Sequence, residues 1–233
     1  MKIQWNDSQR LLSLLLFAWL SIAAGSAQAL PFTLPQGAGT FRLGVVCDDE
    51  SRWLDQCRIK EKGQTYTIKD KLWKEGEVKL TLCPLADSKG FVIEISGKKL
   101  PEGTRLCWTF GGCDDTYMPT AADNRIPIAA CHDNVFSVEG NAVTVYYGEV
   151  MRLRTIHAVT PIGSSIRLSD ARQQESPLLL YHSGKKTDAP VISALCPWKP
   201  QEKLYFCFYK QNAKADYNYF MLPALFEKEF KAQ

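Results

Sequence analysis

The stretch Glu77-Val78-Lys79-Leu80-Thr81-Leu82 decides the fold class of this sequence. Its apolar side chains fall on every second residue, so one face is apolar and the other polar, which is the period of a half-buried β-strand. Farther along, Val138-Glu139-Gly140-Asn141-Ala142-Val143 reads as a hairpin, because turn residues separate two short apolar runs. Both patterns predict antiparallel β-structure.

Working outward, similar short runs recur along the chain with turn residues between them. The expected strands are Thr40–Val46, Gln64–Lys69, Glu77–Leu82, Phe91–Ser96, Arg105–Phe110, Val135–Val138, Ala142–Tyr147, Met151–Val159, Ile166–Leu168, Leu178–Tyr181, Val191–Leu195 and Lys203–Tyr209. Helical periodicity is confined to the end of the chain, where Leu225, Phe226 and Phe230 share a face. The sequence therefore predicts an all-β, two-sheet antiparallel β-sandwich of about twelve strands over residues 30–222, followed by a short helix in residues 223–233.

The N-terminus has the three parts of a secretory signal peptide. Positive charge precedes an apolar run from Leu11 to Ala24, and Ala27-Gln28-Ala29 supplies the small side chains that signal peptidase reads. The run is shorter than the roughly 20 residues of a membrane span. We expect residues 1–29 to be removed before Leu30, which predicts a secreted or periplasmic protein with no membrane segment after cleavage.

Charge and composition exclude some partners and cofactors. The chain has 28 basic and 25 acidic residues, and its basic residues cluster no further than pairs such as Lys98-Lys99. Nucleic-acid binding needs a basic patch or stripe, so we expect no such partner. No Cys-x-x-Cys occurs and the three histidines are scattered, so we expect no metal site and no cofactor.

Eight cysteines follow the signal peptide, and an exported protein can form disulfides. Cys107 and Cys207 lie inside apolar strand sequences and read as core residues, which argues against four disulfides. The pairs expected first are Cys47–Cys57 and Cys113–Cys131, because both span sequence typical of loops.

The longest stretch without strand character runs from Gly111 to Asn134. A long loop on a sandwich is more often a functional segment than a plain connection. Polar and aromatic side chains in and beside it suit sugar recognition, since aromatic faces stack on sugar rings and polar groups bond their hydroxyls. The candidate ligand-binding residues are Trp108, Asp114, Asp115, Tyr117, Asp123, Asn124 and Arg125.

Each of these candidates has an alternative interpretation. Trp108 lies on an apparently central strand, so a core position is as well supported as a binding role, whereas Tyr117 suits an exposed platform better. Asp114, Asp115 and Asp123 could supply the carboxylate pair of a glycoside hydrolase. Neighbouring loop carboxylates are more often solvated or capping groups, and the spacing matches no calcium loop. We therefore assign no catalytic residue.

Two segments resemble an uncharacterised bacterial domain family, a domain of unknown function. The first is Leu100-Pro101-Glu102-Gly103-Thr104-Arg105-Leu106-Cys107-Trp108-Thr109-Phe110-Gly111-Gly112, and the second is Cys131-His132-Asp133-Asn134-Val135-Phe136-Ser137-Val138-Glu139-Gly140-Asn141. Members show Trp-x-Tyr/Phe-Gly-Gly at a strand end, an Asp-bearing loop, and then a segment like Cys-x-x-Asn-x-Phe. The matching positions are Trp108, Phe110, Gly111, Gly112, Asp123, Cys131, Asn134, Phe136, Gly140 and Asn141.

The resemblance implies a supersandwich-type module found at the N-terminus of large exported proteins that look like glycoside hydrolases. Such a module packs beside a catalytic domain, and this chain stops at Gln233, so residues 223–233 are either a helical tail or a truncated connector. Three functions remain open. They are a non-catalytic module that binds polysaccharide or oligosaccharide, the structural half of a split or truncated glycoside hydrolase that docks a catalytic domain, and a small glycoside hydrolase that uses the loop aspartates.

Overall fold

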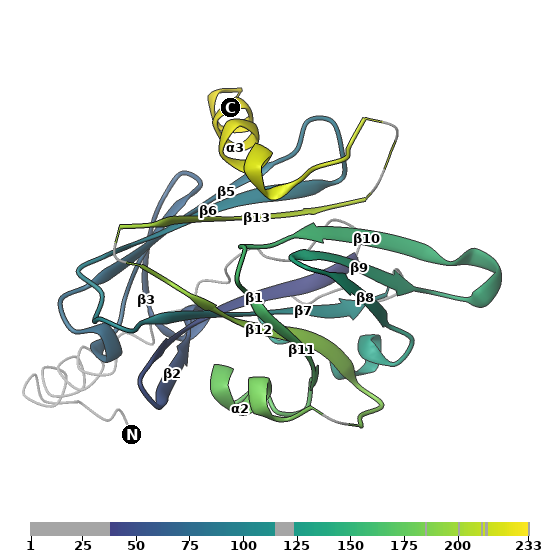
Figure 1. Cartoon of the computed structure of the whole chain (residues 1–233), viewed down its shortest axis with the longest axis horizontal. Coiled ribbons are helices and arrows are strands. Elements are labelled where there is room, and N and C mark those ends of the chain that lie inside the picture. Colours follow the sequence, from purple (N-terminus) through teal and green to yellow (C-terminus); the bar gives the residue numbers. More distant parts are fainter. Residues whose placement is uncertain are drawn as a thin grey trace, which may run out of the picture.

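The fold is a sandwich of two antiparallel sheets (Figure 1). The computed structural model describes residues 38–114, 124–184, 186–199, 201–210, 212 and 214–232. Within them, the five-stranded sheet has the order β11 (Ser165–Asp170), β12 (Pro190–Pro197), β7 (Arg105–Cys113), β1 (Ala38–Cys47) and β2 (Glu50–Trp53). The eight-stranded sheet has the order β3 (Arg58–Lys62), β4 (Thr65–Lys69), β5 (Glu77–Pro84), β6 (Gly90–Lys98), β13 (Lys203–Tyr209), β10 (Arg154–Val159), β9 (Ala142–Tyr147) and β8 (Val135–Glu139). This architecture confirms the predicted β-sandwich.

Aromatic side chains from both sheets fill the space between them. Phe41 of β1 and Phe110 of β7 contact Phe208 of β13, with ring centroids 4.5 and 4.7 Å apart. Trp108 meets Phe206 edge to face at 6.1 Å. All five side chains are fully buried. Every second side chain of a strand points to the same face of its sheet, so these aromatic side chains all point into the space between the sheets. Their packing against one another joins the sheets.

Two strands that the sequence did not predict complete the edges of the sheets. β2 is only four residues long, and β3 reads Arg-Ile-Lys-Glu-Lys, so neither resembles an apolar run. Charged side chains are common on edge strands, where they discourage pairing with another chain. β3 holds its place by pairing with β4 and by the half-buried Ile59, which packs against the core.

The predicted strand Leu178–Tyr181 is wrong, because these residues lie in helix α2 (Pro177–His182). Ser176 begins the helix, with its hydroxyl accepting a hydrogen bond from the backbone N–H of Leu179 at 3.2 Å. Pro177 occupies the first turn, where its missing N–H costs nothing. A short apolar run can belong to a strand or a helix, and here the Ser-Pro start decides for the helix.

The expected C-terminal helix is α3 (Leu222–Lys231), which lies on the outer face of the eight-stranded sheet over β5, β6 and β13 (Figure 1). Leu222, Leu225 and Phe226 pack into an apolar cluster with Tyr205 and Cys207, whose side chains point outward from β13. None of the helices among the described residues is both long and apolar enough to cross a membrane. Residues 1–29 lie outside the described residues, so signal cleavage stays a prediction.

All eight cysteines have free thiols in this structure, including the four of the expected disulfides. Cys57 donates to the carbonyl of Trp53 at 3.1 Å, and Cys131 to the carbonyl of Pro127 at 3.3 Å. Cys113 is also buried near Cys131 but keeps its own thiol. Each of the four thiols in the expected pairs is hydrogen-bonded or buried within its own surroundings, and the two pairings stay predictions from the sequence.

Candidate functional site

The long loop begins at the end of β7, where two glycines let the backbone pass through a crowded place. A Cβ on Gly111 would lie 2.6 Å from the side chain of Val191, so β12 leaves no room for one. Gly112 has φ +66°, a left-handed conformation that glycine adopts without strain. These two constraints give a physical reason for the Gly-Gly of the resembling family.

Asn134 joins the two ends of the loop. Its side-chain oxygen accepts from the backbone N–H of Cys113 at 2.9 Å, and its amide nitrogen donates to the Cys113 carbonyl at 2.9 Å. The same nitrogen donates to the carbonyl of Ala130 at 3.0 Å. A buried amide that satisfies both polar groups of one residue acts like a short piece of β-ladder. Cys113 near the start of the loop is therefore fixed to Asn134 at its end.

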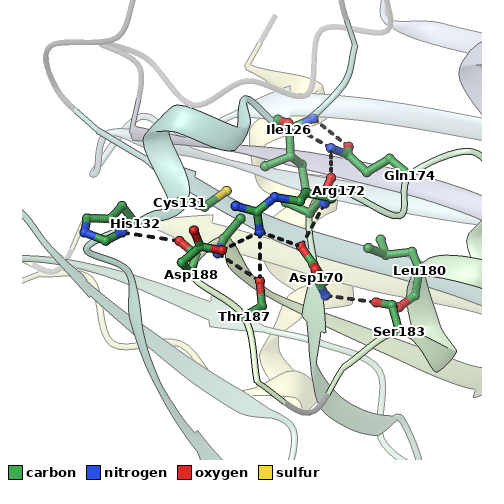
Figure 2. A network of polar contacts seen from close by, with 12 residues as sticks. Ile126, Cys131, His132, Asp170, Arg172, Gln174, Leu180, Ser183, Thr187 and Asp188 are labelled. Carbon is green, nitrogen blue, oxygen red and sulfur yellow. Dashed lines mark hydrogen bonds and ion pairs between the residues drawn. The ribbon is translucent and has the colours of Figure 1, made fainter.

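Gln174 fixes the loop at Ile126 from the connection between β11 and α2 (Figure 2). Its amide nitrogen donates to the carbonyls of Ile126 at 2.9 Å and Ala171 at 2.6 Å, and its oxygen accepts from the N–H of Ile126 at 2.8 Å. The oxygen also accepts from Arg42 at 3.3 Å. Only 4% of Gln174 is exposed, so these bonds form in a dry environment.

Arg42 continues this network into the five-stranded sheet. Its guanidinium holds the Asp55 carboxylate through two bonds of 2.9 and 3.1 Å, and it stacks over the Trp53 ring at 4.2 Å. The two charged side chains are 4% and 8% exposed. Trp53 in turn donates to the carbonyl of Gln174 at 2.8 Å. The base of the loop therefore rests on a buried and well-satisfied polar network.

A group of polar side chains lies on the surface beside this base, and we call it the Arg172 group (Figure 2). Arg172 forms an ion pair with Asp188 and donates to Thr187 and Asp170, each at 3.4 Å. His132, which follows the short 3-10 helix Ile128–Cys131, contacts the carbonyl of Asp188 at 3.4 Å. The Arg172 group thus brings guanidinium, carboxylate, hydroxyl and imidazole groups from three separate segments to one place.

The electrostatics of the Arg172 group favour the charged forms. The hydrogen bond from Arg172 holds the pKa of Asp188 below its ordinary value, and the same bond raises the pKa of Arg172. The two side chains are 67% and 41% exposed, so solvent also stabilises their charges. Asp188 is therefore an ionised hydrogen-bond acceptor at neutral pH.

The structure separates the residues predicted from the sequence. Trp108 is fully buried between the sheets, and its indole N–H donates to Ser164 at 3.3 Å, so the core interpretation is the correct one and neither face of the ring is open to solvent. Asp114 and Asn124 lie half-buried next to the residues that are not described, and Arg125, which follows Asn124, is exposed. Asp115, Tyr117 and Asp123 lie outside the described residues.

The Arg172 group was missed by sequence reasoning. Asp170 and Arg172 are two residues apart, Asp188 is distant from both, and no motif connects them with His132. The one available signal was the polar run between the apolar segments that became β11 and α2. Among the described residues, no three His, Cys, Asp or Glu side chains lie close enough to hold a metal ion.

The comparison with solved structures found a likeness to a family GH92 inverting mannosidase from Bacteroides thetaiotaomicron. The two share 11% sequence identity with a TM-score of 0.44, over 82% of this chain and 26% of the mannosidase chain. This chain thus spans about a quarter of the length of that enzyme. None of the curated proteins is significantly similar in sequence.

A family profile gives a clearer result. The profile described as "Domain of unknown function (DUF4450)" matches residues 34–229, a range that contains both sheets, the Gly111-Gly112 turn, Asn134 and nearly all of α3. The chain therefore belongs to the DUF4450 family.

Proposed function

We propose that this chain is an exported, non-catalytic β-sandwich module of carbohydrate processing that binds glycan through the Arg172 group. The observation that carries the proposal is the exposed Arg172–Asp188 pair above the buried base formed by Gln174. Sugars present many hydroxyls, each of which can donate and accept, so they are bound by convergent donors and acceptors held in place by a rigid base.

The chemistry of Asp188 favours binding over hydrolysis. A glycoside hydrolase needs a carboxylic acid that can give a proton to the leaving oxygen, together with a second carboxylate. The hydrogen bond from Arg172 lowers the pKa of Asp188, which suits an acceptor of hydroxyl hydrogen bonds better than a proton donor. Arg172 and Thr187 supply donors next to it.

Binding to a panel of plant and host polysaccharides tests this proposal. The Arg172→Ala and Asp188→Ala variants should lose most of the binding to any polysaccharide that the wild type retains, while their urea unfolding midpoints stay close to the wild type. Arg152→Ala removes an exposed arginine from the turn before β10 and is the matched control. The proposal fails if no polysaccharide binds, or if the control variant loses as much binding as Arg172→Ala.

A second candidate function is docking of a catalytic glycosidase domain. Three apolar side chains at the C-terminal end are well exposed, namely Phe220 at 83%, Met221 at 46% and Phe230 at 50%. Phe220 and Met221 precede α3 and Phe230 lies near its C-terminal end, and we infer that they belong to one interaction surface along this helix. If they face a catalytic domain, a Phe220→Ser/Phe230→Ser variant should be more soluble than the wild type and should no longer co-purify with a co-expressed catalytic domain from a longer DUF4450 protein. Unchanged co-purification would reject this function.

A further inference from the structure

A strongly basic pocket lies away from the Arg172 group, where the edges of the two sheets meet. It has a volume of about 510 Å³ and is lined by Arg52, Arg58, Lys69, Asp70, Lys71 and Lys74. Arg52 comes from edge strand β2 of one sheet, and Arg58 and Lys69 come from β3 and β4 of the other. Lys71 begins the 3-10 helix Lys71–Trp73, and Lys74 follows its end.

The charges that line this pocket are not balanced by the protein. Asp70 is its single carboxylate; it accepts the backbone N–H of Leu72 at 2.9 Å, caps the 3-10 helix and offsets one of the five positive charges, which leaves an excess of four. The ammonium nitrogen of Lys69 forms an ion pair with a carboxylate oxygen of Glu77 at 3.5 Å. In the described part of the chain, the other four cations form no ion pair. Five like charges around one pocket repel one another, so an anion in it would be stabilised by all of them.

The walls of the pocket are firmly held. Arg52 precedes Trp53, Lys69 follows Ile68, and Lys74 follows Trp73, and each of these three apolar neighbours is fully buried. The backbone beneath each cation is therefore fixed by the core, although the side chains remain exposed. A binding site on rigid elements loses little conformational entropy when a ligand binds.

Lys74 occupies a backbone conformation that suits glycine. It has φ 53° and ψ −117°, and the N–H of Gly76 donates to the carbonyl of Trp73 at 2.9 Å across the turn. This is a type II′ turn with Lys74 at its first central position, where glycine is strongly preferred. A lysine there is strained, and such strain is typical of residues kept for function. The strained residue points to a role for its ammonium group at the pocket.

We propose that this pocket binds an oligosaccharide that carries carboxylate or sulfate groups. Arginine forks match the planar pairs of oxygens on such groups, and the lysines add charge without a fixed geometry. The volume lies within the range of sites for small ligands. The sugar part of this inference rests on the proposed function, whereas the anion part rests on the charges and the strained lysine alone.

Isothermal titration of the exported chain with trigalacturonate tests the inference. A sulfated disaccharide distinguishes sulfate from carboxylate recognition, and neutral galactotriose and inorganic sulfate complete the set. We expect an acidic sugar to bind more tightly than galactotriose or inorganic sulfate, with an affinity that falls as salt is added. Each single cation removed should weaken binding roughly two- to fivefold, in line with exposed charge pairs, and Arg52→Gln/Arg58→Gln about tenfold.

Two further variants separate binding from folding. Lys74→Gly removes a pocket cation but relieves the strained turn, so it should weaken binding while the melting temperature stays the same or rises. Lys62→Gln/Lys79→Gln removes two exposed charges that do not line the pocket and should leave the affinity within twofold of the wild type.

Three results would overturn the inference. They are an unchanged affinity in Arg52→Gln/Arg58→Gln, an equal loss of affinity in Lys62→Gln/Lys79→Gln, and inorganic sulfate binding as tightly as every acidic sugar. The two proposals can fail separately. If a neutral polysaccharide binds, its binding is lost in Arg172→Ala, and the pocket variants leave the affinity for acidic sugars unchanged, then the proposed function stands and the pocket inference fails.

Discussion

Removing the charge of Arg42 should destabilise the chain far more than removing an exposed arginine. The Arg42–Asp55 pair is 4% and 8% exposed, so Arg42→Met leaves a carboxylate in a dry environment without its partner. Breaking a buried pair in this way costs about 3–5 kcal/mol. The loss of the guanidinium over Trp53 adds about 1 kcal/mol. For a domain of this size, in which 1 kcal/mol shifts the melting temperature by about 2–4 °C, we expect the melting temperature to fall by roughly 8–24 °C.

The assay is urea unfolding followed by tryptophan fluorescence, since Trp53 lies in the affected network. Arg167→Met is the matched control, because the Arg167 guanidinium also stacks on an aromatic ring, that of Tyr181 at 4.0 Å, but Arg167 is exposed. It should cost no more than about 1 kcal/mol. The double variant Arg42→Met/Asp55→Leu should recover part of the loss, because no unpaired charge remains.

Two results would refute this reasoning. The first is an Arg42→Met variant that is no less stable than Arg167→Met. The second is a double variant whose loss equals the sum of the two single losses, because this would mean that Arg42 and Asp55 are not coupled. Hydrogen exchange adds a local readout, since the bond from Arg42 to Gln174 connects the pair with the N–H of Ile126 at the loop base. That amide should exchange faster in Arg42→Met.

Three further predictions follow from burial. Burial lowers the pKa of His157 below 6.5, so below pH 6.5 the unfolded chain binds more protons than the folded chain, and the free energy of unfolding should fall as the pH drops. If urea unfolding midpoints are measured between pH 7.5 and 5, His157→Gln should make them depend less on pH. All eight thiols are free, and burial raises the pKa of all eight, so alkylation should be slow in the native state. In urea without reductant, mass spectrometry should count eight alkylated groups, and fewer than eight would mean that disulfides form. Leu222 is fully buried beneath α3, so Leu222→Ala should lower the free energy of unfolding in urea by about 2–4 kcal/mol. Phe230 is half exposed, so Phe230→Ala should lower it by less than half as much, and equal losses would contradict the packing of α3.

Local sequence patterns were sufficient for most of the fold. The alternation in Glu77–Leu82 and the turn at Gly140-Asn141 predicted strands that the structure contains, because the period of two is set within each strand. The same patterns could not place the charged strand β3 (Arg58–Lys62), whose position depends on pairing with β4. Nor could they separate strand from helix in Leu178–Tyr181, since four apolar residues satisfy both periods.

The sequence by itself determined the fold class, the export signal that we expect at the N-terminus, and the loop after Gly111-Gly112 as a region to inspect. These depend on residues that are neighbours in the chain. Only the tertiary structure decided that Trp108 is a core residue, that the cysteines are free, and that Arg172 and Asp188 lie beside His132. The basic pocket was also decided by the tertiary structure alone, because its cations come from the edges of two different sheets. Contacts between distant segments arise when sheets pair and pack, and no local pattern of residues records them.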